Sequence, residues 1–454
     1  MPIIHQLVKW VIVMAKLRIK DNSENDELQF KPISTLTRKV ENKTLQQLEK
    51  EGIFVFPETV NDTDDLSQDQ FVLQQVNHAY RTGNVMGFLG AGEDRLAIQS
   101  RFSTGQHDYL LQYMLEKVLD FPNILNLDTD ANRNHQFLNL LVFLFPYYLR
   151  TAMRKGPFKT YVRTQYNNQN IRGVVDIARH IRCNVPFTGK IAYNQREFSY
   201  DNNLMELIRH TIEFIQTKSF GTQLLRTVND EVMSVVSCTN QYNYQNRRKI
   251  MLQNQKNPVR HAYYQEYRNL QRLCLMILKH EKQQIGTGMQ PIHGILFDGA
   301  WLWEEYIHIL IGSQFYHPRN KAGEGAQRLF EKNNGLIYPD FISRNDDRRV
   351  IADTKYKPIN NIGNRDYLQV LAYMFRFDAR KGFYLYPESK KNAVKMLRLN
   401  QGSTYERNVK PREDIRVTKC GLKIPTNVSN YEQFIEEIKR NETEFLQQLQ
   451  ADQN

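Results

Sequence analysis

Two short apolar segments joined by a polar loop place the strongest constraint on the fold of this chain. The first, "IYPDFIS", runs from residue 337 to 343, and the second, "RVIADTKYK", runs from residue 349 to 357. Apolar and polar residues alternate in both, which predicts two β-strands, and the loop between them is short enough for neighbouring strands. The apolar start at Val350 is typical of a strand at the centre of a sheet, and Pro358 ends the second strand.

The side chains at these strands predict a site for phosphodiester chemistry. Strand periodicity places Asp353, Lys355 and Lys357 on one face, and Asp340 is carried by the neighbouring strand. Two carboxylates supply the hard oxygen ligands that Mg²⁺ prefers, together with water and phosphate oxygens. Lys355 would orient or deprotonate an attacking water and offset the negative charge that develops on the phosphoryl group. Carboxylates alone would repel a phosphodiester, whereas carboxylates with a cation and a lysine attract it.

Predicted helices flank the two strands. "GAWLWEEYIHILIG" is amphipathic, and helical spacing puts Glu304 at the border of its apolar face while Glu305 points well away. Downstream, "RDYLQVLAYMFRF" places Gln369, with Asp366 and Tyr373, on one stripe before a predicted strand "GFYLYP". The order helix, strand, strand, helix, strand predicts an α/β unit.

The charge of the chain points to a polyanionic partner. Lys and Arg outnumber Asp and Glu by 61 to 49, giving a net charge of +12. Basic residues are interleaved with tyrosines between residues 241 and 282, which is the composition of a surface that follows a phosphate backbone and stacks on bases. A solvated helical face has the same composition. The candidate DNA-binding residues of this stretch are Arg247, Arg248, Lys249, Tyr263 and Tyr264.

The chain divides near residue 290, where the glycines of "QQIGTGMQ" interrupt the helical pattern. We expect a mixed α/β region over 1–290, with a sub-boundary near 150, and a second domain over 291–454 that ends in a helical extension. In the first region, alternation predicts a hairpin that turns at Ala91 to Asp94, and a second hairpin is expected around Thr188 and Gly189 before a helix that starts near Asp201.

Several function classes are disfavoured. The glycines of "GFLGAG" are not followed by Gly-Lys-Ser/Thr, so a phosphate-binding loop is not expected, and any nucleotide hydrolysis would belong to another chain. Four widely spaced cysteines indicate neither disulfides nor a zinc site. The longest apolar stretch near the start is interrupted by His5 and Lys9, so we expect no membrane span or signal peptide and a cytoplasmic location.

The set Glu304, Asp340, Asp353, Lys355 and Gln369 resembles the restriction-endonuclease-type core known as PD-(D/E)xK. The segments "LWEEYI", "YPDFI", "IADTKYK" and "YLQVLAYM" resemble more particularly the McrC family, the nuclease subunits of McrBC-type and LlaJI-like restriction systems. The match covers roughly residues 295 to 390, and a weaker similarity extends upstream through "NIRGVVDIARHIRCNVPF" and beyond.

This resemblance implies roles for individual residues. Asp340 and Asp353 would be ligands of Mg²⁺, or of Mn²⁺ in its place, Glu304 an auxiliary carboxylate on the metal side, Lys355 the catalytic lysine and Gln369 an active-site helix residue. The substrate would be double-stranded DNA, including methylated DNA. The partner would be a McrB-like hexameric AAA+ GTPase, whose activity the chain would stimulate.

Two other functions remain open from the sequence. One is a non-catalytic adaptor in which the nuclease fold only binds DNA or activates the motor. The other is a nuclease that acts alone on RNA or single strands. The long region before residue 290 carries no catalytic signature and favours a docking role, so a fragment that starts near residue 290 is expected to keep the catalytic fold but not to join the motor.

Overall fold

The computed structural model describes residues 17–51, 53–56, 70–103, 108–118, 135–283, 292–318, 327–332, 334–345, 349–389, 394–402 and 409–453. Residues 135–283 form one compact unit, and the described residues on both sides of it together form the other. The mixed α/β class is confirmed. None of the helices among these residues is long and apolar enough to cross a membrane.

The expected division into 1–290 and 291–454 needs correction. Residues 17–118 pack with the C-terminal part of the chain instead of with residues 135–283. The sub-boundary near residue 150 is wrong, because helix α5 (His135–Met153) runs continuously through it. The boundary near 290 falls outside the described residues, between helix α11 (Gln265–Gln283) and Ile292.

A five-stranded sheet joins the two ends of the larger unit. Its order is β1-β7-β6-β11-β3, and β11 comes from the C-terminal half of the chain. β11 pairs antiparallel with β6 and parallel with β3. The hairpin predicted at Ala91 to Asp94 is confirmed, because these two residues pair where β6 meets β7. The strands are β1 (Leu17–Lys20), β3 (Ile53–Phe56), β6 (Val85–Ala91), β7 (Asp94–Gln99) and β11 (His293–Asp298).

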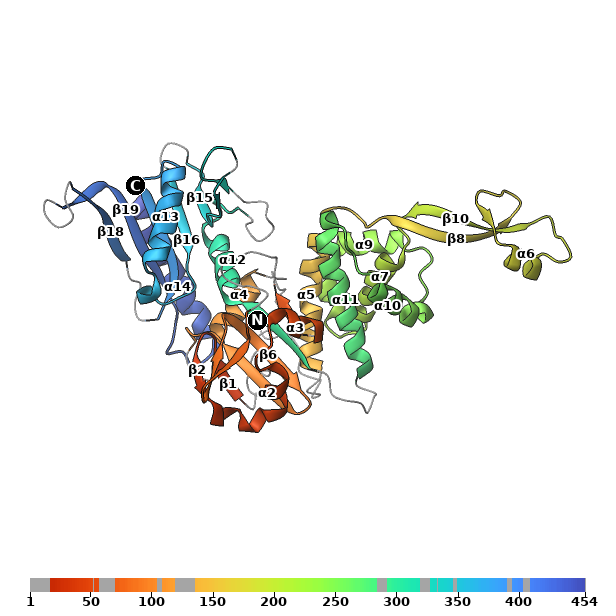
Figure 1. The fold of residues 1–454 in the computed structure, drawn as a ribbon, viewed down its shortest axis with the longest axis horizontal. Coiled ribbons are helices and arrows are strands. Elements are labelled where there is room, and N and C mark those ends of the chain that lie inside the picture. Colours follow the sequence, from red (N-terminus) through yellow and green to blue (C-terminus); the bar gives the residue numbers. More distant parts are fainter. Residues whose placement is uncertain are drawn as a thin grey trace. The chain divides into compact units, whose positions relative to one another are not determined.

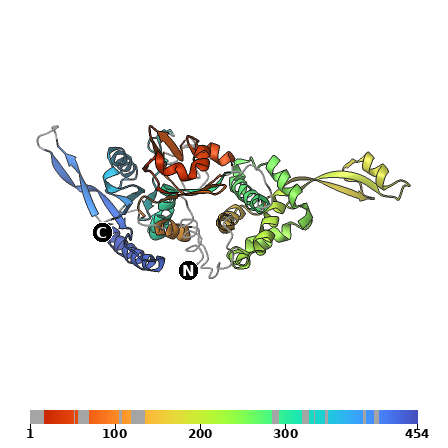
Figure 2. The ribbon, with the colours of Figure 1, turned by 90° about the horizontal axis from the view of Figure 1, so that it is seen from below.

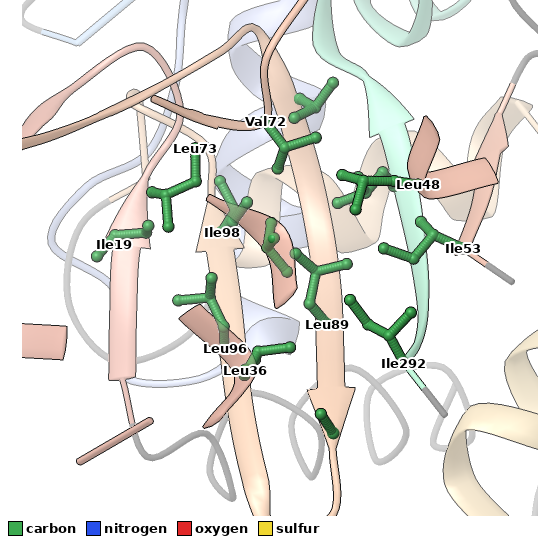
Figure 3. Close-up of a cluster of buried hydrophobic side chains, with 14 of the residues drawn as sticks. Ile19, Leu36, Leu48, Ile53, Val72, Leu73, Leu89, Leu96, Ile98 and Ile292 are labelled. Atoms are coloured by element: carbon green, nitrogen blue, oxygen red, sulfur yellow. The ribbon is translucent and has the colours of Figure 1, made fainter. Parts of the chain in front are cut away.

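Apolar side chains from both halves of the chain fill the core beside this sheet (Figure 3). Ile292 and Leu296, next to and within β11, pack in the same cluster as residues of helices α2 (Ser34–Val40) and α3 (Leu45–Glu51). A small sheet borders this region, formed by β2 (Glu24–Asp26), β4 (Leu73–Val76) and β5 (Ala79–Thr82). Strand β11 therefore contributes to a core whose other members lie almost entirely within the first 100 residues.

A six-stranded sheet of order β12-β15-β16-β17-β19-β18 follows. β16, β17 and β19 run parallel, and β12, β15 and β18 are antiparallel to their neighbours. Helix α13 (Asn364–Arg376) connects β16 to β17 and contacts both strands, while α14 (Tyr431–Gln453) packs on β19. The strands are β12 (Phe315–Tyr316), β15 (Phe341–Ser343), β16 (Val350–Thr354), β17 (Lys381–Glu388), β18 (Val394–Gln401) and β19 (Lys410–Lys423).

Helix α12 (Gly299–Ile311) connects the two sheets directly. It begins where β11 ends, and the buried carboxylate of Asp298 accepts hydrogen bonds from the backbone N–H groups of Ala300 and Trp301 at 2.9 and 3.2 Å. An Asp at this position satisfies two of the N–H groups that a helix start leaves unpaired. α12 then contacts β16 and helix α4 (Tyr109–Val118). The first sheet thereby fixes the start of the helix that carries Glu304.

Residues 135–283 form a bundle of helices with a projecting hairpin (Figures 1 and 2). The hairpin consists of β8 (Thr160–Asn168) and β10 (Ile191–Ser199), and β9 (Val174–Val175) and α6 (Ile177–Cys183) lie in its connection. The turn expected at Thr188 and Gly189 is therefore only the end of a long connection. The helix expected near Asp201 is confirmed as α7 (Asn203–Gln216). The other helices are α8 (Gly221–Arg226), α9 (Asn229–Cys238) and α10 (Arg247–Lys256).

Candidate active site

Asp340 lies beside Asp353 on the neighbouring strand. β15 and β16 pair antiparallel with Phe341 opposite Ala352, and continuing this register by one residue places Asp340 opposite Asp353. Side chains at directly opposed positions have Cβ atoms ~5 Å apart. The Oδ2 atom of Asp340 accepts hydrogen bonds from the backbone N–H and the hydroxyl of Thr354, both at 2.7 Å. These two bonds fix the Asp340 carboxylate against the end of β16.

The predicted strand over 337–343 is interrupted before Asp340. Residues 336–337 form β14 (Leu336–Ile337), which pairs only with β13 (Gln327–Arg328), whereas β15 begins at Phe341. Asp340 thus lies in the connection that enters β15. The positive φ of Gly335 and the proline at 339 break the local strand geometry that alternation alone suggested.

Lys355 forms an ion pair with the buried Asp353. Its Nζ lies 2.6 Å from Oδ2 of Asp353, whose side chain is 1% exposed. A buried carboxylate is stabilised only when such a partner compensates for its lost hydration. The expected strand over 349–357 ends earlier, at Thr354, but the N–H of Lys355 still donates to the carbonyl of Leu385 in β17 at 3.0 Å. The lysine backbone is therefore held by the sheet although it lies beyond the strand.

Gln369 reaches the same lysine from helix α13. The Nζ of Lys355 donates to Oε1 of Gln369 at 3.1 Å, and Nε2 of Gln369 donates to the hydroxyl of Tyr373 at 2.8 Å. Burial and the charge of Asp353 raise the pKa of Tyr373, so its hydroxyl stays protonated. The predicted stripe of α13 thus faces the strand residues, and it holds the lysine between two partners.

A second lysine binds the start of the same helix. The Nζ of Lys357 contacts both carboxylate oxygens of Asp366 at 2.8 Å, and Asp366 also accepts a hydrogen bond from the N–H of Gly363. Lys355 lies 3.9 Å from Asp366. The sequence analysis placed Asp366 on the helix stripe but missed its part in this ion pair.

Glu304 faces His317, a residue that the sequence analysis missed. The Nε2 atom of His317 lies 3.8 Å from Glu304 and 3.6 Å from Glu305, and its Nδ1 is hydrogen-bonded to the backbone carbonyl of Asp340 at 2.9 Å. Glu305, which helical spacing placed away from the apolar face of α12, thus lies near the same histidine as Glu304. No sequence motif marks His317.

The environment of His317 favours its charged form. Burial lowers the pKa of His317, but the hydrogen bonds to Glu305 and to the Asp340 carbonyl, with the nearby negative charges, outweigh burial, and the net shift is upward. The histidine therefore links α12 to the residue that enters β15.

The donor atoms of Asp340 and Asp353 suit a divalent cation. Among the described residues, no three His, Cys, Asp or Glu side chains gather closely enough to hold a metal ion. Mg²⁺ commonly binds through one or two carboxylates and takes its other ligands from water and substrate phosphate. Two opposed carboxylates beside a lysine fit that requirement.

Tyr356, between the two lysines, is anchored in the segment that follows β7. Its hydroxyl lies 2.6 Å from the hydroxyl of Ser100, and its ring makes an edge contact with Phe102 at 5.2 Å between ring centroids. The guanidinium of Arg101 lies over the same ring at 5.1 Å. Gly299, the first residue of α12, leaves space for this ring, because a Cβ there would lie 2.7 Å from it. The end of the lysine-bearing strand is thus fixed by residues about 250 positions earlier in the chain.

Comparison with known families now becomes informative. A family model described as "McrBC 5-methylcytosine restriction system component" matches residues 80–387. The chain belongs to this McrBC family. No curated protein matches it.

Two solved structures are similar to this McrBC family member. One is a refined half-complex from a tetradecameric assembly of Thermococcus gammatolerans McrB AAA+ hexamers with bound McrC, at 14% identity and a TM-score of 0.44, with 93% of this chain and 99% of that chain covered. The other is a cryo-EM structure of the Thermococcus gammatolerans McrBC complex, at 15% identity and a TM-score of 0.30, with 65% of this chain and 87% of that chain covered.

The candidate DNA-binding residues of the McrBC family member do not all face the solvent. Arg247 is half-buried, with its guanidinium 5.3 Å from the ring centre of Phe214, whereas Arg248 and Lys249 are exposed. Tyr263 is 55% exposed. Tyr264 is half-buried and packs edge-on against Phe158 at 4.9 Å. Local periodicity could not separate the inward residues from the outward ones, because the rings that receive them come from elsewhere in the unit: Phe214 from α7 and Phe158 from the segment before β8.

Proposed function

We propose that this chain is the DNA-cleaving subunit of a McrBC-type restriction system and hydrolyses phosphodiester bonds at the site around Asp353. One observation carries the proposal: a buried aspartate at 2.6 Å from Lys355, with a second aspartate opposite it at the entrance to the adjacent strand. This is the core expected of a restriction-endonuclease-like nuclease, and membership of the McrBC family supports it.

Each residue has a separate task in the proposed reaction. A water molecule attacks the phosphorus atom and releases a proton to solvent, and the bond from phosphorus to the leaving oxygen breaks as that oxygen takes up a proton from solvent. Lys355 offsets the negative charge that builds up on the non-bridging oxygens, because its ammonium is held in place before the reaction begins. Gln369 and Asp353 hold that ammonium from two sides. When bound by Asp340 and Asp353, Mg²⁺ or Mn²⁺ would polarise the phosphate and lower the pKa of the attacking water.

The test is cleavage of plasmid DNA by the full chain with its partner GTPase. Lys355→Ala should lower the nicking rate by about 100-fold or more, as expected for the loss of one preorganised charge. Lys395→Ala is the matched control, because it removes the same charge from an exposed position of β18, away from the site. Excess chelator should stop the reaction. Normal cleavage by Lys355→Ala would contradict the nuclease proposal, and a wild-type chain that stimulates the GTPase without cutting DNA would establish the adaptor function instead.

We also propose that residues 135–283 dock on the AAA+ GTPase partner. The connection between β8 and β10 exposes apolar side chains that no part of the unit covers: Val174, Ile177, Val185 and Phe187 are 67–76% exposed. Large apolar side chains left exposed to this degree in one connection are typical of protein interaction sites. Ile177→Asp with Phe187→Asp should abolish stimulation of GTP hydrolysis, whereas Tyr244→Asp, at another exposed position of the unit, should preserve it. Unchanged stimulation by the double variant would place the docking surface elsewhere.

A further inference from the structure

One face of the hairpin carries both cations and aromatic rings. β8 and β10 pair antiparallel with Tyr161 opposite Phe198 and Arg163 opposite Arg196. Directly opposed residues share a face, as do residues two apart along a strand. Continuing the register by two residues places Lys159 opposite Tyr200. We call these three pairs the cation–aromatic ladder.

The contacts within the ladder confirm that its members share a face. The rings of Tyr161 and Phe198 lie 5.0 Å apart between centroids. The guanidinium of Arg196 lies 4.5 Å from the centre of the Tyr161 ring. Lys159 lies over both Phe198, at 5.0 Å, and Tyr200, at 4.7 Å. The positive charges and the aromatic rings therefore lie side by side on this face.

The ladder is open to solvent although it is rich in aromatic surface. Tyr161 is 60% exposed, Phe198 is 52% exposed and Tyr200 is 43% exposed. Farther out along the hairpin, α6 covers the same face, where Asn194 of β10 donates a hydrogen bond to Asp176 and Asn167 of β8 donates one to Asn184, both at 3.2 Å. The ladder is thus the part of this face between the helical bundle and α6 that no element of the unit covers.

The positive charges of the ladder favour binding of an anionic partner. Arg163 and Arg196 stand directly opposite each other, an arrangement of like charges that destabilises a strand pair. Glu197 belongs to the other face, where its carboxylate accepts a hydrogen bond from Tyr166. Asp176, near the α6 end, pairs with Arg179 at 3.6 Å, and its charge also interacts with that of Arg163. A polyanion bound along the ladder would offset the repulsion between the arginines.

We propose that the ladder binds a single-stranded segment of DNA, with its phosphates on Lys159, Arg163 and Arg196 and its bases on the three rings. Open ring faces on a sheet stack on unpaired bases, whereas a duplex hides its base faces. The choice of DNA among polyanions rests on the proposed function. The site differs from the stretch around Arg248 and Lys249 that the composition indicated.

The test measures binding of fluorescein-labelled oligo(dT) to the full chain by anisotropy over a series of salt concentrations. All proteins carry Lys355→Ala, so that DNA is not cut. Tyr161→Ala with Phe198→Ala should weaken binding by about tenfold or more with an unchanged salt slope, because stacking is independent of counterion release. Arg163→Gln with Arg196→Gln should make the slope of log K against log salt shallower by about 1.4, from ~0.7 for each phosphate contact of a single strand.

Matched controls separate the ladder from general charge and from misfolding. Arg182→Gln with Lys190→Gln removes two exposed cations from the same hairpin connection and should leave both the affinity and the slope nearly unchanged. The double variant Tyr161→Phe with Phe198→Tyr keeps both rings, so it should bind oligo(dT) as tightly as the protein with the unchanged ladder. Oligo(dT) should bind more tightly than a duplex or an oligo(U) of the same length.

Several results would overturn the proposal: equal losses in the control and ladder variants, no loss in either ladder variant, or tighter binding of duplex or RNA. Loss of GTPase stimulation with unchanged oligo(dT) binding would assign the ladder to the protein partner. These outcomes are distinct from a failure of the nuclease proposal. That proposal is tested by cleavage with Lys355 present, and a chain that fails to cleave can still bind oligo(dT) through the ladder.

Discussion

Replacing Tyr356 by phenylalanine tests whether the first 118 residues hold the lysine-bearing strand in place. The change removes only the hydroxyl that contacts Ser100 at 2.6 Å, at a point where both residues are buried. Ser100 still accepts a hydrogen bond from the N–H of Phe102, but its hydroxyl loses the phenol oxygen as a partner, and the sulfur of Met86 loses the phenol hydroxyl at 3.2 Å. Leaving a buried polar group without its partner costs about 1–3 kcal/mol. We therefore expect the free energy of unfolding to fall by that amount.

Tryptophan fluorescence isolates the relevant unit in this experiment. The chain has three tryptophans, at positions 10, 301 and 303, and none lies between residues 122 and 287. Urea unfolding followed by fluorescence thus reports on the unit that contains Tyr356. Tyr316→Phe is the matched control, because Tyr316 is 52% exposed and belongs to the same unit, and it should change the stability by less than about 0.5 kcal/mol.

A double-mutant cycle shows whether the hydroxyl pair is responsible. Ser100→Ala combined with Tyr356→Phe removes both partners, so the combined loss should be smaller than the sum of the single losses by about 0.5–1.5 kcal/mol. Because Tyr356 lies between Lys355 and Lys357, kcat for DNA cleavage should also fall, while KM should change little. Strictly additive stability losses, or normal kcat in the destabilised Tyr356→Phe variant, would refute the anchoring role.

Two further predictions concern other charged groups. Burial raises the pKa of Asp108 to about 6. Between the usual pKa of an aspartate and this raised value, the folded state therefore holds a proton that the unfolded state has released. The free energy of unfolding should fall by roughly 3 kcal/mol as pH rises from about 4 to above 6, at ~1.4 kcal/mol per pKa unit. The urea midpoint should fall with pH across this range in the wild type and not in Asp108→Asn. Neutralising Arg248 and Lys249 should weaken duplex binding and make the slope of log K against log salt shallower. Arg247→Gln should instead lower the melting temperature, because it loses the contact with Phe214. Equal salt slopes in both variants would indicate that this stretch is a solvated surface that does not bind DNA.

Features set by neighbouring residues could be predicted from the sequence. The buried run of β16, the stripe of α13 and the hairpin of β6 and β7 each have a local pattern, and the structure contains all three. Strand periodicity placed Asp353 and Lys355 side by side, whereas the meeting of Gln369 with them was implied by the resemblance to the PD-(D/E)xK core.

Pairings between strands that are far apart in the sequence had no comparable local pattern. The sequence of β11 has the pattern of an ordinary apolar strand. Nothing in its residues indicates that it pairs with β6 and β3, about 200 positions earlier. The contact between Tyr356 and Ser100 and the position of His317 depend on those pairings or on irregular segments. The predicted hairpin at Thr188 and Gly189 failed for a related reason, since the turn residues were visible but the register of β8 with β10 was not.

The pairing of β11 also reverses one expectation from the sequence and leads to a final prediction. A fragment that starts near residue 290 would lack both strands that flank β11 and the Ser100 partner of Tyr356, so it should not keep the catalytic fold. Replacing residues 119–291 by a long flexible Gly/Ser linker removes the other unit and retains every one of these partners, and loop-closure entropy grows only slowly with linker length. This deletion variant should show native tryptophan fluorescence and unaided DNA cleavage equal to that of the full chain, and it should not stimulate the GTPase. A folded fragment of residues 291–454 would show that the five-stranded sheet does not support the site, and an unfolded deletion variant would show that this sheet is not sufficient without the other unit.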